Sequence, residues 1–156
     1  MPSRRDLIRM TPDEIAAYLA GQSRIILVSI GADGMPHPVP MNYGIDGDGR
    51  IVCTSFRKSV KVANLRRDPR ATLLVESGDS YETLRAVIVW TDAEVIDDAE
   101  EVMELMQLIG AGDTLAASMD PTRREQVRAS MTKRVVLRFT PFRMSSWDHA
   151  RLGGYY

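Results

Sequence analysis

Residues 54–70 place hydroxyl and basic side chains in an order that suits the binding of a phosphate group. Thr54 and Ser55 end a predicted strand, and three cations follow near the start of a predicted helix: Arg57, Lys58 and Lys61. A phosphate monoester needs several hydrogen-bond donors and compensation of its charge, and hydroxyls, cations and the free amides of a helix N-terminus supply both. The stretch therefore predicts a phosphate site. The alternative interpretation is a solvated basic face of a helix.

Charge is separated along the chain, although the net charge is only −1. Residues 57–70 carry six basic side chains and one acid, Asp68, whereas residues 86–122 carry no Lys or Arg. A nearly neutral protein with one basic segment favours a local anionic ligand over a long polyanion. Binding of single-stranded nucleic acid also needs aromatic platforms among the basic residues. The basic stretch holds only Phe56, so we expect no nucleic-acid partner.

The remaining chemically active residue types form no familiar catalytic or metal-binding pattern. His37 and His149 have no metal-ligand spacing, so we expect no metal site. Cys53 is the single cysteine and falls within a predicted strand, where a small buried residue is a more usual role than a nucleophile. It cannot form an internal disulfide, which favours a reducing, cytoplasmic location. Residues 1–10 do not resemble an export signal, and no apolar run approaches the roughly 20 residues of a membrane span.

The chain of 156 residues, 44% of them hydrophobic, predicts a single domain over residues 1–156. Turn signals separate predicted strands at 24–30, 37–45, 50–55, 70–76, 84–95, 134–140 and 142–147. Helices are predicted at 12–20, 59–67, 98–109 and 121–131. Only tight turns separate the first three strands, so they are expected to form an antiparallel meander.

Six or seven antiparallel strands with peripheral helices fit a small barrel, because closing the sheet removes its exposed edges. The segments 25–28 and 86–90 are almost continuously apolar. Such strands bury both faces, one inside the barrel and the other under a helix or a second subunit. The pattern therefore predicts a homodimer.

Three segments taken in order resemble the flavin-binding split-barrel family. They are His-Pro-Val-Pro-Met at 37–41, Ile-Val-Cys-Thr-Ser at 51–55 and Lys-Val-Ala-Asn-Leu-Arg-Arg-Asp-Pro-Arg at 61–70. The family includes pyridoxamine 5'-phosphate oxidases and the flavin/deazaflavin oxidoreductases that use FMN or coenzyme F-420. The similarity spans roughly residues 27–95 and, weakly, 145–149, and the string at 64–70 most resembles the deazaflavin branch. The resemblance implies a mainly β fold, a six-stranded antiparallel split β-barrel with peripheral α-helices. It also implies a homodimer with two cofactor sites, both at the interface between the subunits.

The resemblance also implies roles for individual residues. We expect the cofactor ring to lie beside Val39, Pro40 and Met41. We expect its phosphate to contact Thr54, Ser55 and Lys61, with Arg57 or Lys58 as the second cation. From the second subunit, we expect the cofactor to be contacted by Tyr81 and Arg85. Trp147 is expected to wall the ring pocket, together with His37 and Tyr43. Asn64 is expected to orient local backbone.

The expected function is hydride transfer between a bound FMN or F-420 and a small organic substrate that the sequence does not identify. The cofactor carries this chemistry, so no protein nucleophile is needed. The alternative is a protein that binds or carries a flavin or haem, or senses redox state, without turnover. True pyridoxamine phosphate oxidases end in an Arg-Leu-His-Asp-Arg-like motif. This chain has Arg151 and Leu152 but neither the His nor the second Arg, which argues against vitamin B6 oxidation.

Overall fold

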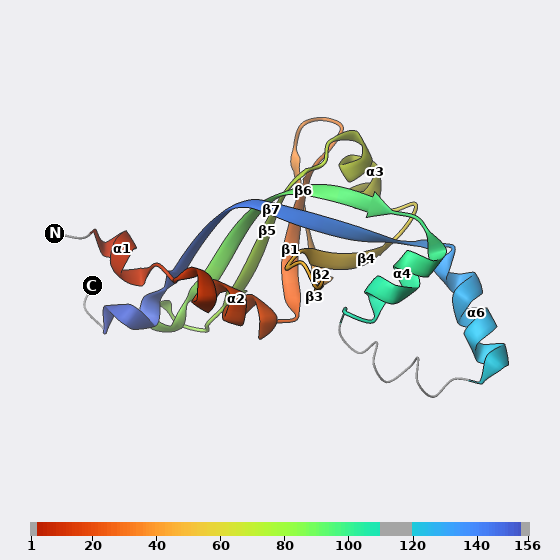
Figure 1. Ribbon diagram of the computed structural model, residues 1–156. Coiled ribbons are helices and arrows are strands. Elements are labelled where there is room, and N and C mark those ends of the chain that lie inside the picture. Colours follow the sequence, from red (N-terminus) through yellow and green to blue (C-terminus); the bar gives the residue numbers. More distant parts are fainter. Residues whose placement is uncertain (1–2, 110–119, 154–156) are drawn as a thin grey trace.

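The computed structural model, which describes residues 3–109 and 120–153, contains a curled antiparallel sheet of seven strands in the order β2-β1-β5-β6-β7-β4-β3 (Figure 1). The strands are β1 (Arg24–Ile30), β2 (Pro36–Asn42), β3 (Gly44–Ile45), β4 (Ile51–Phe56), β5 (Arg70–Ser77), β6 (Arg85–Ile96) and β7 (Arg134–Asp148). The helices are α1 (Arg4–Ile8), α2 (Pro12–Ala20), α3 (Val60–Arg67), α4 (Ala99–Met106) and α6 (Pro121–Met131), with short 3-10 turns at Tyr81–Thr83 and His149–Leu152. The mainly β split barrel predicted from the sequence is confirmed.

The sheet has one strand more than the six of the implied barrel, and two strand boundaries differ from those predicted. The extended segment 37–45 divides at Tyr43 into β2 and β3, which lie at opposite edges of the sheet. The two strands expected at 134–140 and 142–147 are one strand, β7. Pro141 lies opposite Thr91 and Arg143 opposite Trp90, so Phe142 is the extra residue of a β-bulge that accommodates the proline.

The two antiparallel pairings predicted for the first three strands are formed, but the segment 37–45 makes them with separate parts, β2 with β1 and β3 with β4. β1 pairs with β2 on one side and with β5 on the other, whereas β4 pairs with β3 and β7. After β2 the chain crosses to the opposite edge of the sheet through Tyr43 alone. A single residue can join two edges only if the sheet curls until those edges lie close together.

Tyr43 holds this crossing in place. Its side chain is 4% exposed, and its hydroxyl donates a 2.5 Å hydrogen bond to the carbonyl of Leu19 at the end of α2. Its backbone amide donates to the carbonyl of Ser23. Burial raises the pKa of the phenol, which therefore stays protonated and able to donate. Tyr43, expected to line a ring pocket, instead links the sheet edges to α2.

Two clusters of buried side chains lie on the two faces of the sheet. The inner cluster fills the barrel and includes Leu27, Leu73, Val87, Leu137 and Phe139, with α2 and α3 packed onto it through Leu19, Val62 and Leu65. The second cluster lies between α4 and the outer face of β4, β6 and β7 and includes Val52, Ile96, Val102, Leu105 and Val136. Part of the outer face is thus covered by a helix, but not at 25–28 or 86–90, where the two-sided apolar pattern predicted a cover.

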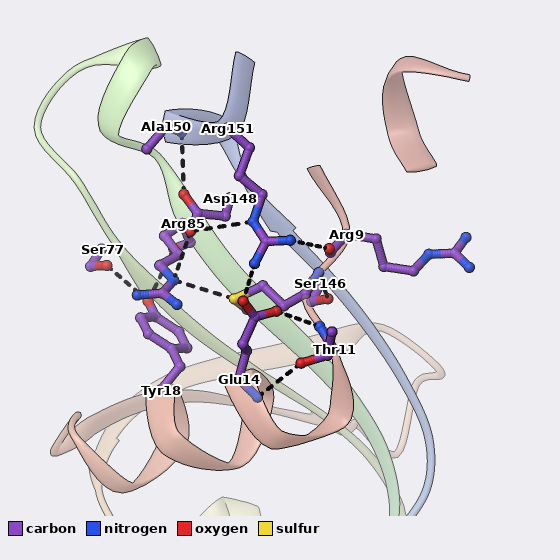
Figure 2. A network of polar contacts seen from close by, with 11 residues as sticks. Arg9, Thr11, Glu14, Tyr18, Ser77, Arg85, Ser146, Asp148, Ala150 and Arg151 are labelled. Carbon is purple, nitrogen blue, oxygen red and sulfur yellow. Dashed lines mark hydrogen bonds and ion pairs between the residues drawn. The ribbon is translucent and has the colours of Figure 1, made fainter. Parts of the chain in front are cut away.

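Both ends of the described chain meet at one end of the sheet (Figure 1). The Arg151 guanidinium donates to Glu14 of α2 at 2.5 Å and to the carbonyl of Arg9 at 2.8 Å, as Figure 2 shows. The buried amide of Met10 donates to Ser146 of β7. Helix α1 was not predicted from the sequence, although Ser3 and Asp6 form a reciprocal cap at its start. These contacts fix the segment that follows α1 onto β7.

Replacing Gly44 is expected to destabilise the barrel because a Cβ at this position would overlap the backbone carbonyl of Leu108. Backbone cannot move aside as cheaply as a flexible side chain, so Gly44→Ala should lower the free energy of unfolding by about 1 to 3 kcal/mol in urea titrations. Gly47→Ala is the matched control, since a Cβ there meets nothing within 4 Å. Equal stabilities of the two variants would contradict this packing.

The Glu14–Arg151 pair is expected to make stability depend on acidic pH. The Arg151 hydrogen bond, with those from Thr11, lowers the pKa of Glu14 from 4.5 to about 2. A lowered folded-state pKa contributes stability above the unfolded value, and this contribution disappears as the pH falls from 4.5 towards 2. Glu14→Gln should therefore lower the Tm at neutral pH, and the difference from wild type should vanish near pH 2. A Tm difference that stays constant over this range, or an equal effect of the neighbouring Asp13→Asn, would refute the assignment.

Candidate functional site

The predicted phosphate residues lie where β4 ends and α3 begins, but the two hydroxyls of β4 point to opposite faces of the sheet, as neighbours on a strand must. The Ser55 hydroxyl is buried and lies 2.8 Å from the hydroxyl of Ser59, the residue that precedes α3. The Thr54 hydroxyl is directed instead to the carbonyl of Val135 on β7, at 3.5 Å. The structure thus brings Ser55 to the start of α3 and leaves Thr54 against the neighbouring strand.

The first two backbone amides of α3 form no hydrogen bond within the helix. Ser59 has the extended conformation of an N-cap, yet its side chain makes no capping hydrogen bond to the helix. The amides of Val62 and Ala63 close the first turn by donating to the Ser59 carbonyl. Those of Val60 and Lys61 have no acceptor within the helix, as the geometry of a helix start requires. Two amides and a serine hydroxyl pair therefore converge at the positive end of the helix dipole.

Most cations of the basic stretch are already paired. Arg57 and Arg66 both donate to Asp97, at 2.5 and 2.6 Å. Arg67 donates to the carbonyl of Ile30. Arg70 binds Asp68 at 2.7 Å and, with its backbone amide, lowers the pKa of that carboxyl to about 2.

Lys58 and Lys61 differ from these arginines. Within residues 3–109 and 120–153, neither lysine forms an ion pair. Lys58 is exposed in the turn before α3, and Lys61 is partly buried in its first turn. The structure therefore favours Lys58 over Arg57 as the second cation of the predicted phosphate site.

Cys53 lies close enough to Lys61 for the ammonium charge to act on its thiol, but burial has the larger effect and raises the pKa of Cys53 to about 12. The side chain is fully buried in the inner cluster. A thiol that stays protonated is not a nucleophile. Cys53 is therefore a core residue, as its position in the strand predicted.

The strand expected beside the cofactor ring presents its residues to two sides. Val39 and Met41 point inward and pack against the inner cluster, whereas Pro40 points outward and is exposed. Their side chains therefore cannot all meet one ring. His37 also points inward, opposite Ser29 of β1, and its Nδ1 is buried without a hydrogen-bond partner in the described part of the chain.

Sequence reasoning missed a polar contact between α3 and β1. The Asn64 amide donates to the buried Ser29 hydroxyl at 3.1 Å, and its carbonyl accepts from Arg67. Asn64 was expected to orient local backbone and instead joins these two side chains. Ser29 sits in a β-branched apolar run and carries no signal of its own in the sequence. Only the placement of α3 against β1 reveals the contact.

The residues expected from a second subunit lie at the other end of the sheet. Arg85 begins β6, where it pairs with Asp148 at 3.3 Å and lies over the ring of Tyr18 (Figure 2). Tyr81 packs its exposed ring on His149, with centroids 4.5 Å apart. Trp147 is partly buried on β7, opposite Ala86.

These three residues are far from the lysines of the same chain. Figure 1 shows α3 near one end of the sheet and the turns beside residues 81 and 149 at the other. Arg85 and Asp92 lie seven residues apart on β6, which corresponds to roughly 23 Å of extended strand. The two groups therefore lie at opposite ends of the sheet (Figure 1).

Two features are absent from the described residues. No helix there is long and apolar enough to cross a membrane. No group of three or more His, Cys, Asp or Glu side chains in the same part of the chain is arranged to hold a metal ion.

A family model and several solved structures match this chain. The family model described as pyridoxamine 5'-phosphate oxidase matches residues 11–148. The crystal structure of a conserved hypothetical protein, Rv2991 of Mycobacterium tuberculosis, is 34% identical over 99% of this chain and 95% of that one, with a TM-score of 0.83.

Two more distant structures share the fold. One is described as an F-420 reductase and is 21% identical over 83% of this chain and 94% of its own, with a TM-score of 0.61. The other, a FAD-binding protein of Mesorhizobium loti, is 16% identical over 88% of this chain and 94% of its own, with a TM-score of 0.66. At these identities the similarity establishes the architecture alone.

Proposed function

The chain belongs to the pyridoxamine 5'-phosphate oxidase family of split barrels, and from this we propose that it is a cytoplasmic oxidoreductase that binds FMN or coenzyme F-420. In this proposal hydride passes between the cofactor and a small organic substrate. The observation that carries it is that Lys58 and Lys61, which form no ion pair among the described residues, lie beside the open amides of α3. Similarity to an F-420 reductase and to a FAD-binding protein supports the cofactor class.

The chemistry of this donor set fits a phosphate-bearing cofactor. The two ammonium groups would compensate the phosphate charge, while the first amides of α3 would donate to its oxygens. When Ser55 donates to Ser59, the hydrogen of the Ser59 hydroxyl is free to donate to the phosphate. Arg57 and Arg66 already neutralise Asp97, so that acid does not compete for the lysines.

The cofactor, when bound, would supply the hydride-accepting ring, and the chain's own residues would hold and orient it. Val39 and Met41 pack against the inner cluster, which would exclude water from that side of β2. No nucleophile is required, which agrees with the protonated and buried thiol of Cys53. Lys58 and Lys61 would act by positioning, because charge at the phosphate fixes where the ring lies.

Vitamin B6 oxidation does not fit this chain. Arg151 is the remnant of the C-terminal motif with which true pyridoxamine phosphate oxidases grip their substrate. Here its guanidinium is engaged by Glu14 and by the carbonyl of Arg9, so it serves to hold the ends of the chain together.

The proposed enzyme is a homodimer. Two cross-strand rows on the outer face of the sheet are exposed or only partly buried and, apart from Thr72, apolar: Pro40, Ile26, Leu74 and Ile88 in one, and Pro38, Val28 and Thr72 in the other. The outer face under α4 is buried, whereas these rows are not covered in the same way by any described helix. A second copy packed on them would also bring Tyr81, Arg85 and Trp147 of one chain within reach of the other chain's lysines.

We expect the protein to bind FMN or F-420 more tightly than the corresponding phosphate-free chromophore. Lys58→Gln combined with Lys61→Gln should weaken binding about tenfold or more, because each charge-assisted hydrogen bond contributes about 1.5 to 3 kcal/mol. Titration calorimetry of the apoprotein with FMN, riboflavin, F-420 and its phosphate-free deazaflavin measures both effects. The absorbance spectrum of the protein as purified separates FMN from F-420.

Arg70→Gln is the matched control, since Arg70 belongs to the same basic stretch but is paired with Asp68. It should leave the affinity unchanged. If neither cofactor binds, the proposed function is wrong. If a cofactor binds but its stopped-flow reoxidation is not accelerated by any quinone, enone or nitro acceptor, the protein is a carrier rather than an enzyme.

Placing a charge in the outer rows should dissociate the dimer. Ile88→Lys would bury an unpaired ammonium against the second copy, which is strongly unfavourable. Size-exclusion chromatography with light scattering should give a dimer for the wild type and a monomer for Ile88→Lys. Met103→Lys, at an exposed apolar position on α4, should remain dimeric. A monomeric wild type would exclude the proposed interface.

A further inference from the structure

A groove of about 420 Å³ lies between the segment around α1 and the portion of β7 that follows its bulge. Its lining combines three arginines, Arg5, Arg9 and Arg143, with apolar side chains that include Met10, Trp90 and Met144. The volume lies within the usual range of small-molecule sites. The residues assigned above to the phosphate site contribute nothing to it.

The wall of this groove is held in place by the fold. The Met10 side chain is 3% exposed, and its backbone amide donates a 3.1 Å hydrogen bond to the Ser146 hydroxyl. Arg151 donates to the carbonyl of Arg9 at 2.8 Å, so it clamps the backbone from which the Arg9 side chain extends (Figure 2). The groove is therefore formed before any ligand arrives.

In the described part of the chain, the guanidinium groups of Arg5, Arg9 and Arg143 make only long or exposed polar contacts. Arg143 lies 4.0 Å above the ring of Trp90 and forms no ion pair in the described part of the chain. Arg5 makes a long contact of 3.4 Å with the Ser145 hydroxyl. Arg9 is 3.6 Å from Asp6, and both of these side chains are at least half exposed. Asp6 is the acid that pairs within this cluster, so the lining carries a net positive charge.

Arg143 is well prepared to bind a carboxylate. A guanidinium held over an aromatic ring can still bind a planar anion in a bidentate manner through its N–H groups. The stacking also restricts the side chain before binding, which lowers the entropy lost when a ligand is held. Apolar surface from Trp90 and Met144 adjoins this cation.

We propose that this groove binds a small organic carboxylate, with the carboxylate held by Arg143 and Arg9 and the apolar body lying on Trp90 and Met144. The inference goes beyond the proposed oxidoreductase activity and needs no cofactor. It can therefore hold or fail independently of binding at Lys58 and Lys61.

Two-dimensional NMR of the cofactor-free protein tests the proposal, with benzoate and the neutral isostere benzamide as probes. Benzoate should shift the indole N–H of Trp90 and the backbone amides of residues 9, 10 and 143–146, with a Kd about tenfold lower than that of benzamide. Acetate should bind more weakly than benzoate because it lacks the apolar body. Arg143→Gln should weaken benzoate binding about tenfold, and Arg9→Gln should weaken it in the same direction.

Arg24→Gln, an exposed arginine at the start of β1, is the control and should leave the Kd of benzoate unchanged. The spectrum of each variant reports whether it remains folded. The proposal is overturned if benzoate and benzamide bind equally, if acetate binds as tightly as benzoate, or if Arg143→Gln keeps the wild-type affinity. It is also overturned if the affected residues shift with protein concentration rather than with benzoate, since a second copy of the chain would then occupy the groove.

Discussion

The connection between the two edges of the sheet is the constraint on which the rest of the structure depends. A single buried residue, Tyr43, separates β2 at one edge from β3 at the other, and its hydroxyl is tied to the end of α2. Gly44 then lies so close to the backbone of Leu108, just beyond α4, that no side chain fits. Because these edges must meet, the seven strands curl into a barrel whose inner face is dry.

The curl also determines where the basic stretch can act. Helix α3 follows β4 and packs Val62 and Leu65 onto the inner cluster, so its first turn is held beside the end of the barrel. Asp97, at the end of β6, then accepts from Arg57 and Arg66. Ion pairing within the fold thus engages Arg57, Arg66 and Arg70, and our proposal assigns the two lysines to the ligand.

The two ends of the sheet carry different groups of polar side chains. The end with α3 carries the candidate phosphate site, whereas the other end carries the network that joins Arg151, Glu14 and Arg9 and forms one wall of the arginine-lined groove. Between them lie the half-buried rows around Ile26 and Leu74. A surface of this kind on the middle of a sheet favours association with a second copy, which would place opposite ends of two chains next to each other.

Local patterns in the sequence determined the elements: β-branched runs between turns marked nearly every strand, and Thr11, Pro12 and Glu14 marked the start of α2. They also determined that Thr54 to Lys61 is chemically distinctive, because residue types and spacing are local properties. Strand order, the single long β7 and the pairing of Arg57 with Asp97 depended on the tertiary structure. Arg57 lies 40 positions from Asp97, and β7 pairs with β4 and β6 across 40 positions or more. A choice between alternative partners at that distance is decided only when the chain packs.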